Sequence, residues 1–352
     1  MRQTPPLHRM QMRLRTLLHV LLVSSTQTSA QRACGATQNI IRVQDATGVD
    51  ILRTALSCTG GGAVEAQWVG SVSVNAPIAV VEGIFLSVTG EDARSEVHGG
   101  GAQTRLFDVS PGGSLTLTRL KLSGGSADGG GAIYSQHANL ALDNCTFHMN
   151  VATDGDGGAV WATGGNVTIV GGEFSANNAT RYGGAVYAVE SRLVFQGGSR
   201  LQDNKAIVGG ALFCGVEGGA TKTAAFCSIT DAKFVSNSAA RDNQDWVEHL
   251  SDLDGGGAAM FQAASVEITD SEFSGNHALL SGGALHGGFD ASISVNGCIF
   301  GNNTAEKFGG AISASSLTLG GSTQLSGNLA YDDGGAVSSV MHTRYQQYLV
   351  QC

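Results

Sequence analysis

The sequence is poor in proline and in charge, and it has no long hydrophobic run. Only 4 of the 352 residues are proline and 14% are charged, whereas 51 are glycine. The glycines follow no Gly-X-Y period, which excludes a collagen-like chain, and the 42% of hydrophobic residues argues against disorder. The net charge is −9 and no cluster of lysine and arginine occurs, so the sequence predicts no nucleic-acid-binding surface.

Catalytic motifs are also missing. The sequence has no G-x-S-x-G, H-E-x-x-H, P-loop or C-x-x-C motif. Stacked carboxylates can hold Ca²⁺, and several aspartates come just before glycine pairs: Asp128, Asp154, Asp156, Asp254, Asp332 and Asp333. Other copies of this position carry Tyr182, Val208, Ser281 and Phe308. The turn preference of Asp-Gly explains the pattern better than calcium does, and we predict no catalytic residue, cofactor or metal site.

Two phrases recur along most of the chain. Eight copies of Gly-Gly-Ala form a series at intervals of 25–27 residues, apart from one gap of 47. The alanines are Ala132, Ala159, Ala185, Ala211, Ala258, Ala284, Ala311 and Ala336. Upstream of all but the first runs an aromatic residue or Leu, two residues, Asn, one residue and Ala: FHMNVA, FSANNA, LQDNKA, FVSNSA, FSGNHA, FGNNTA and LSGNLA. A fixed period of this length is typical of a solenoid.

The stretches between the two phrases predict strands. "NLALDNCTF" and "SVEITDSEF" alternate apolar and polar residues, and glycine and asparagine turns separate them without room for crossover helices. The sequence therefore predicts an all-β, single-stranded parallel β-helix, with right-handed winding. Roughly a dozen coils would give a rod on the order of 55–60 Å long. We expect an N-terminal cap and degenerate coils over 31–118, including a helix at "GVDILRTALSC", and repeats over 119–352 with insertions near 214–227 and 238–255.

The asparagine of the second phrase occurs once in each coil. The residues are Asn150, Asn177, Asn204, Asn237, Asn276, Asn303 and Asn328. Because each follows an aromatic residue or Leu that is expected to be buried, we predict an internal ladder of amide hydrogen bonds. The alternative is a row of ligand-binding amides on the surface.

The N-terminus predicts export. Arg13 and Arg15 precede the apolar run "TLLHVLLV", and Ala30 ends a small-residue segment, so residues 1–30 are typical of a signal peptide. The apolar run is too short to span a membrane, and no later stretch is long enough. Four sequons predict N-glycosylation in a eukaryotic source: Asn144, Asn166, Asn178 and Asn302.

The seven cysteines leave at least one unpaired in a monomer. We predict two disulfides, Cys34–Cys58 around the N-terminal helix and Cys214–Cys227 at the base of an insertion. Cys145 and Cys298 both lie two residues before the repeat phenylalanine, and they are expected to be buried packing residues.

The pairing of "GGA" plus an aliphatic residue with "FxxN" resembles the chlamydial polymorphic outer membrane protein repeat. The resemblance covers about residues 119–340. It implies a β-helix displayed at a surface, with adhesion or recognition roles. Because the chain after Ala336 ends in "VSSVMHTRYQQYLVQC", we expect a secreted, extracellular or wall-associated protein rather than one anchored in an outer membrane.

Two features suggest ligand binding. The position two residues after each repeat alanine carries Tyr134, Trp161, Tyr187, Phe213, Met260, His286, Ser313 and Ser338. If the preceding aliphatic residue points inward, these side chains point outward, as an exposed aromatic stripe or as a self-stacking column. The insertion "RDNQDWVEHLSDLDG" places Trp246 on the apolar face of a predicted helix, as a lid over the stripe or as a surface decoration.

The sequence as a whole predicts a non-enzymatic protein for surface recognition, adhesion or matrix structure. Its partner would be an extracellular glycan or a cell-surface protein, with Tyr134, Trp161, Tyr187, Phe213 and Trp246 as the candidate binding residues. The competing hypothesis is a β-helix enzyme that acts on acidic polysaccharide. The oligomeric state does not follow from the sequence.

Overall fold

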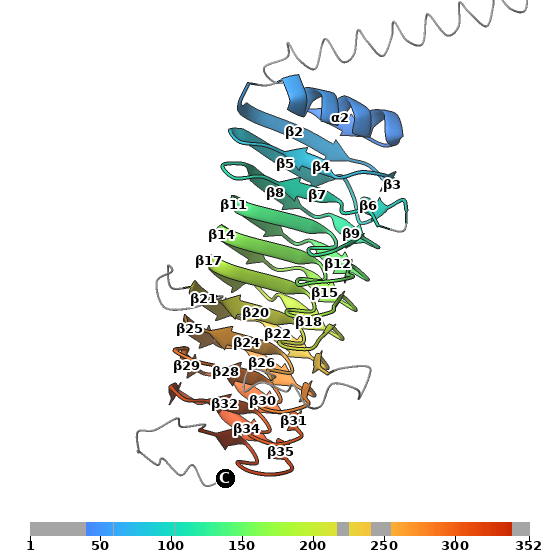
Figure 1. Cartoon of the computed structure of the whole chain (residues 1–352). Helices are drawn as coiled ribbons and strands as arrows, with labels where there is room; N and C mark the ends of the chain where they lie inside the picture. The colour runs from blue at the N-terminus through green and yellow to red at the C-terminus, as the bar shows by residue number, and fades with distance from the viewer. Residues whose placement is uncertain (1–39, 59, 102, 217–224, 241–254, 340–352) are drawn as a thin grey trace, which may run out of the picture.

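The chain winds into a parallel β-helix, as its computed structural model shows (Figure 1). The structure describes residues 40–58, 60–101, 103–216, 225–240 and 255–339. The predicted signal peptide, Cys34 and Trp246 lie outside these residues. Within them, all strand pairings are parallel and form three sheets of 18, 10 and 8 strands. The predicted fold class is therefore confirmed.

From β8 (Ser114–Thr118) onward each coil contributes strands to the three sheets in turn, whereas the coils that contain β3 (Ser71–Val74) and β6 (Glu96–Gly99) add none to the 8-stranded sheet. The 18-stranded sheet contains β1 (Ile41–Val43), β2 (Gly62–Trp68), β4 (Ile78–Val80), β5 (Ile84–Gly90), β7 (Phe107–Val109), β8 (Ser114–Thr118), β11 (Ile133–Asp143), β14 (Val160–Val170), β17 (Val186–Gln196), β20 (Leu212–Gly215), β21 (Ala225–Thr230), β24 (Ala259–Gln262), β25 (Ala264–Thr269), β28 (Leu285–Gly287), β29 (Ser292–Asn296), β32 (Ile312–Ala314), β33 (Leu317–Gly320) and β36 (Val337–Ser338). The 10-stranded sheet contains β3 (Ser71–Val74), β6 (Glu96–Gly99), β9 (Lys121–Ser123), β12 (Thr146–His148), β15 (Glu173–Ser175), β18 (Arg200–Gln202), β22 (Lys233–Val235), β26 (Glu272–Ser274), β30 (Ile299–Gly301) and β34 (Gln324–Ser326). The 8-stranded sheet contains β10 (Ser126–Ala127), β13 (Val151–Ala152), β16 (Asn178–Ala179), β19 (Lys205–Ala206), β23 (Ser238–Ala239), β27 (His277–Ala278), β31 (Thr304–Ala305) and β35 (Leu329–Ala330).

The Gly-Gly-Ala phrase is the turn that leads into the 18-stranded sheet. Gly183 has a φ of 61°, a left-handed conformation that glycine adopts at little cost. A Cβ on Gly184 would collide with the carbonyl oxygen of Gly210 in the next coil. The double glycine is therefore required by backbone conformation at its first residue and by the close approach of coils at its second.

The repeat phenylalanines stack inside the rod. The rings of Phe147 and Phe174 lie 4.5 Å apart with an interplanar angle of 4°, and Phe273 and Phe300 lie 4.8 Å apart at 5°. Where a coil has a leucine instead of this phenylalanine, at Leu201, the ring of Phe195 packs edge-on against both neighbouring phenylalanines. The core is thus continuous from coil to coil, and it holds the stack in register.

The helix α2 (Ala46–Cys58) covers the N-terminal end of this core (Figure 1). Its first turn is capped by Asp45, whose side chain accepts a hydrogen bond of 2.9 Å from the backbone N–H of Gly48. Val49, Leu52 and Leu56 are buried on the face that meets the first coils. The predicted capping helix is confirmed.

The rod is shorter than we predicted. The 10-stranded sheet counts ten coils rather than a dozen. A dozen coils would need about 26 residues in every coil from residue 34 on, but Ala46–Cys58 forms the capping helix, and the coil between Ala211 and Ala258 is 47 residues long. In the last described coil Leu317, Leu325 and Val337 are only partly buried.

Candidate ligand-binding surface

The repeat asparagines lie inside the rod and bond to one another. In the middle of the row, the Oδ1 atom of Asn204 accepts hydrogen bonds of 3.0 Å from both the backbone N–H and the Nδ2 of Asn177. The Nδ2 of Asn204 in turn donates to the carbonyl oxygen of Phe174 at 2.9 Å. The same pattern runs from Asn150 to Asn328. Six of the seven are buried, so these amides support the fold and are not available to a ligand.

The position two residues after the repeat alanine points away from this core. The pairing of successive strands places Tyr134 beside Trp161, Trp161 beside Tyr187, and Tyr187 beside Phe213. The preceding aliphatic residues belong to the main core, whereas Tyr187 and Phe213 belong to a separate hydrophobic cluster. We call the row from Tyr134 to Ser338 the outward column.

Most of the outward column is not exposed, and the predicted exposed stripe is wrong for Tyr187 and Phe213. Each is only 2% exposed, and Met260 is fully buried. The cause is the residue just before the glycine pair, which we call the pre-glycine position. Tyr182 occupies it in one coil, with its ring centroid 5.1 Å from that of Phe213, and Val208 occupies it in the next. These apolar side chains fold over the column and cover it.

The column is open at Tyr134 and Trp161, where the pre-glycine position beside the rings lacks an apolar side chain. Gly129 and Asp156 occupy this position beside Trp161, and a Cβ on Gly129 would lie 3.5 Å from the indole ring. Tyr134 and Trp161 are consequently half-buried rather than covered. We call Arg105, Tyr134 and Trp161 the open section, and Tyr187, Phe213 and Met260 the covered section.

The rings of the open section turn their edges, not their faces, to solvent. Tyr134 and Trp161 lie 4.2 Å apart with an interplanar angle of 4°, so each covers a face of the other. The guanidinium carbon of Arg105 lies 4.6 Å from the Tyr134 ring centroid, on the ring face, and Tyr187 lies 6.0 Å beyond Trp161. Of the two alternatives for this position, the structure therefore supports the self-stacking column, because the rings stack on each other along the rod.

The exposed edges carry polar atoms. The hydroxyl of Tyr134 and the indole N–H of Trp161 make no hydrogen bond with the described residues. Burial raises the pKa of the Tyr134 phenol, against the opposing effect of Arg105, so the hydroxyl keeps its proton at neutral pH. Half-buried Gln136 and Thr163 stand beside each other two residues further along the same strands.

A shallow groove continues from these residues. It has a volume of about 340 Å³ and is lined by His137, Gly164, Gly165 and Glu190, from three successive coils. His137 has a φ of 46° and Glu190 of 53°, so the strands bend here and the two side chains occupy equivalent positions. The open section and the groove beside it thus combine aromatic edges with both hydrogen-bond donors and hydrogen-bond acceptors.

Comparison with known proteins identifies the repeat. Residues 297–315 match the Chlamydia polymorphic membrane protein (Chlamydia_PMP) repeat, and this segment contains both "FGNNTA" and "GGAI". The chain carries this repeat. The predicted resemblance is confirmed.

Comparison with solved structures gives a distant similarity. The similar chain is the catalytic unit of a thermostable GH87 alpha-1,3-glucanase from Streptomyces thermodiastaticus strain HF3-3, with 15% identity and a TM-score of 0.32 over 90% of this chain and 71% of that one. No match was found among curated proteins.

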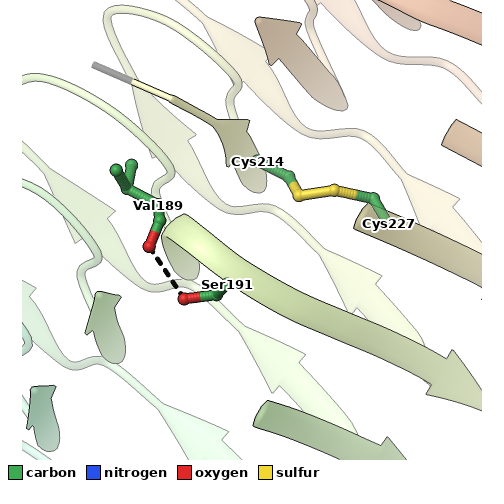
Figure 2. The surroundings of a disulfide bond; sticks show 4 residues. All are labelled: Val189, Ser191, Cys214 and Cys227. Atoms are coloured by element: carbon green, nitrogen blue, oxygen red, sulfur yellow. Dashed lines mark hydrogen bonds between the residues drawn. A yellow bond between two sulfur atoms is a disulfide. The ribbon is translucent and has the colours of Figure 1, made fainter. Parts of the chain in front are cut away.

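One disulfide joins two strands next to the covered section. Cys214 in β20 and Cys227 in β21 are bonded, with their Cα atoms 6.7 Å apart (Figure 2). Beside it the Ser191 hydroxyl donates a 2.8 Å hydrogen bond to the Val189 carbonyl (Figure 2). The predicted Cys214–Cys227 bridge is confirmed. The Cys34–Cys58 pairing stays a prediction because Cys34 lies outside the described residues.

Cys145 and Cys298 are free and buried. Desolvation raises the pKa of the Cys145 thiol to about 11, and it also raises that of Cys298. Both thiols therefore stay protonated at neutral pH. They pack within the repeats, as expected.

The four sequon asparagines are all exposed: Asn144, Asn166, Asn178 and Asn302. The Nδ2 of Asn166 donates to Asn139 at 2.9 Å, and that of Asn144 to Asp143 at 2.8 Å. Their positions leave the amides accessible to modification, and their glycosylation stays a prediction.

The remaining candidate residues do not form a second site. Asp156 is paired with Arg181, whose Nε lies 3.0 Å from the carboxylate. Asp332 and Asp333 are exposed in the last described coil, and Asp254 and Trp246 lie outside the described residues. Among the described residues no group of three potential metal ligands occurs, and no helix there is long and apolar enough to cross a membrane.

Sequence reasoning missed three residues that shape the surface. Arg105 comes before the first complete repeat, so no periodicity marks it. Tyr182 and Gly129 were visible as variable residues before the glycine pair, but their effect on the column depends on which side chain folds over which coil. The variation at the pre-glycine position was the available signal.

Proposed function

We propose that the protein is a secreted β-helical rod that recognises an extracellular glycan through the open section. The observation that carries the proposal is the half-buried pair Tyr134 and Trp161, whose polar edges have no hydrogen-bond partner among the described residues. The outward column is buried from Tyr187 to Ser313, which makes this opening a local feature and not a property of every repeat.

The chemistry of the open section favours a neutral or weakly charged polyhydroxyl ligand. Arg105 already has a partner for its charge, because it lies 3.2 Å from Asp108 and donates to the carbonyl oxygens of Gly129 and Gly130. Phenol, indole, amide and hydroxyl groups can supply donors and acceptors to sugar hydroxyls. The ligand would contact ring edges and hydrogen-bond with them, since the ring faces are occupied.

Binding to a glycan array tests the proposal with substitutions that preserve the ring stack. Tyr134→Phe together with Trp161→Phe removes both polar edges, and we expect binding to fall about tenfold or more, as the loss of two hydrogen bonds predicts. Gly129→Val places an apolar side chain over Trp161 and should also weaken binding. Tyr331→Phe, at a side chain that is 65% exposed in the last described coil, is the matched control and should bind as the parent does.

Two results would contradict the proposal. Unchanged binding by the double variant would place the ligand elsewhere on the rod. Turnover of a uronate polymer in a parallel lyase and hydrolase assay would favour the competing enzyme hypothesis instead.

A further inference from the structure

A second polar cavity lies at a corner of the N-terminal coils, where β5 leads into β6. Later coils turn this corner with two residues, 119–120 or 144–145, whereas here the chain uses residues 91–95. Gly90 allows the longer turn to lie close to the next coil, because a Cβ there would collide with the carbonyl oxygen of Arg119. The turn forms one wall of a cleft of about 520 Å³, which we call the corner cleft.

The wall of the corner cleft carries equal numbers of acidic and basic side chains. Glu91 and Asp92 contribute two carboxylates, and Arg119 and Lys121 contribute two cations. Three of the four are held by ion pairs with residues outside the wall: Glu91 with Arg42, Asp92 with Arg94 and Lys121 with Glu96, at 2.9, 2.8 and 2.9 Å. A neutral ligand with many hydroxyl groups suits such a wall better than an anion or a cation, because donors and acceptors alternate and no net charge remains.

Arg119 differs from the other three charged groups. Its side chain is exposed, and its guanidinium makes no ion pair or hydrogen bond with the described residues. Its backbone N–H is fixed by a 2.9 Å hydrogen bond to the carbonyl oxygen of Asp143, the residue before Asn144. The guanidinium of Arg119 therefore presents five donor hydrogens at the corner cleft, beside the coil that carries Asn144.

Asn144 itself lines the corner cleft, together with Thr146 of its own Asn-Cys-Thr sequon. Its φ of 50° places it at the corner, and its side chain is exposed. We propose that the first sugar residue of an N-linked glycan on Asn144 sits in the corner cleft and hydrogen-bonds with Arg119. This inference rests on the proposal that the protein is secreted.

The other sequons provide internal controls. Asn166, Asn178 and Asn302 are also exposed, but none of them lines the corner cleft. A glycan on any of these three would extend into solvent. The four sites should therefore be modified alike during export but differ in how well the folded protein protects the sugar.

The test is site-resolved deglycosylation of the native full-length chain, secreted from a host that adds N-glycans. Peptide mass spectrometry would follow the release of sugar by peptide N-glycosidase at each asparagine. We expect release at Asn144 to be about tenfold slower than at Asn178, the factor that one or two added hydrogen bonds give. After denaturation the two rates should become equal.

Replacing Arg119 in the wall of the corner cleft tests whether this residue causes the slower release. Arg119→Gly tolerates the left-handed backbone, whose φ is 53°, and should raise the rate at Asn144 towards that at Asn178 without changing the other sites. Two results would contradict the proposed sugar contact but not the proposal that the protein is secreted. They are equal rates of sugar release at Asn144 and Asn178 in the native protein, and an unmodified Asn144 when the other three sequons are modified. Four unmodified sequons would overturn the proposal that the chain is a secreted glycoprotein as well.

Discussion

The open and the covered sections of the outward column are built from the same repeat, yet they meet solvent differently. Tyr134 and Trp161 are half-buried, whereas Tyr187 and Phe213 are each only 2% exposed. Strand register and side-chain direction are the same in both, so neither explains the contrast. The pre-glycine position does, since Tyr182 covers the column in one coil and Asp156 leaves it open in another.

The contrast shows how a solenoid acquires a local surface. The inward positions are constrained in every coil by the Phe stack and the asparagine ladder. The pre-glycine position varies from Gly129 and Asp156 to Tyr182 and Val208, and this variation accompanies the change from half-buried to covered rings. Four predictions test this view, from the largest expected effect to the smallest.

Truncating a ring in the two sections should have unequal effects on stability. Phe213→Ala should lower the free energy of unfolding by about 3–5 kcal/mol, because it leaves a cavity in the covered section. Tyr134→Ala should cost about 1–2 kcal/mol, since that side chain is already half-exposed. Chemical denaturation measures both, and Tyr331→Ala is the exposed control. Equal losses for Phe213 and Tyr134 would show that the sections do not differ in burial.

The asparagine ladder should contribute equally to stability in the coils of the open section and in those of the covered section. Asn177 belongs to the coil of Trp161 in the open section, and Asn237 belongs to the coil of Phe213 in the covered section. Both asparagines are fully buried, and each is replaced by alanine. Each change removes four side-chain hydrogen bonds, three to neighbouring asparagines and one to a backbone carbonyl, so each should cost about 2–3 kcal/mol. Asn328→Ala, at the half-buried end of the row, should cost less. A large difference between the two mid-ladder variants in urea denaturation would mean that the coils are not equivalent inside.

Removing the side chain that covers the rings should make the covered section more exposed, like the open section. Tyr182→Ala uncovers Tyr187 and Phe213, and the lost contacts should cost about 1–2 kcal/mol. The exposed rings should then become accessible to a tyrosine-modifying reagent, with Tyr187 as the site followed by mass spectrometry. If Tyr187 stays as protected as in the parent, another segment covers it and the role assigned to Tyr182 is wrong.

Acid should affect the N-terminal coils more than the covered section, because charged contacts hold their outer surface. Burial opposes ionisation of Glu96, but hydrogen bonds from Ser123, Lys121 and Ser71 outweigh it and lower its pKa from 4.5 to about 2. Since the folded-state pKa lies below the unfolded one, the carboxylate stabilises the fold above pH 4.5, and this contribution is lost as the pH falls towards 2.

Glu96→Gln is therefore expected to destabilise the protein at pH 7 by about 1 kcal/mol, a value that allows for solvent screening of the side chain. The difference from the parent should vanish near pH 2, as measured by denaturation at a series of pH values. Glu272→Gln breaks the more exposed pair with Lys233, 3.1 Å apart, and should give a smaller difference. A difference for Glu96→Gln that persists unchanged at pH 2 would argue for a packing defect instead.

The sequence alone determined the repeating part of this protein. The coil, its Phe stack and the buried row of asparagines follow from periodic residues, because every copy has to satisfy the same neighbours above and below. The Cys214–Cys227 bridge follows from the position of the two cysteines at the base of an insertion. Sequence also predicted which residues leave the core at the outward column. These features depend on local spacing, which a single chain displays.

Only the tertiary structure decided what the outward residues meet. Tyr134 and Tyr187 occupy equivalent places in the sequence, and their exposure differs because side chains from the turns of their own and neighbouring coils cover one of them and not the other. The corner cleft arises in the same way, from a longer turn that lies against Arg119 and Asn144 of later coils. Contacts between turns of different coils are not periodic, so no repeat pattern could have predicted them.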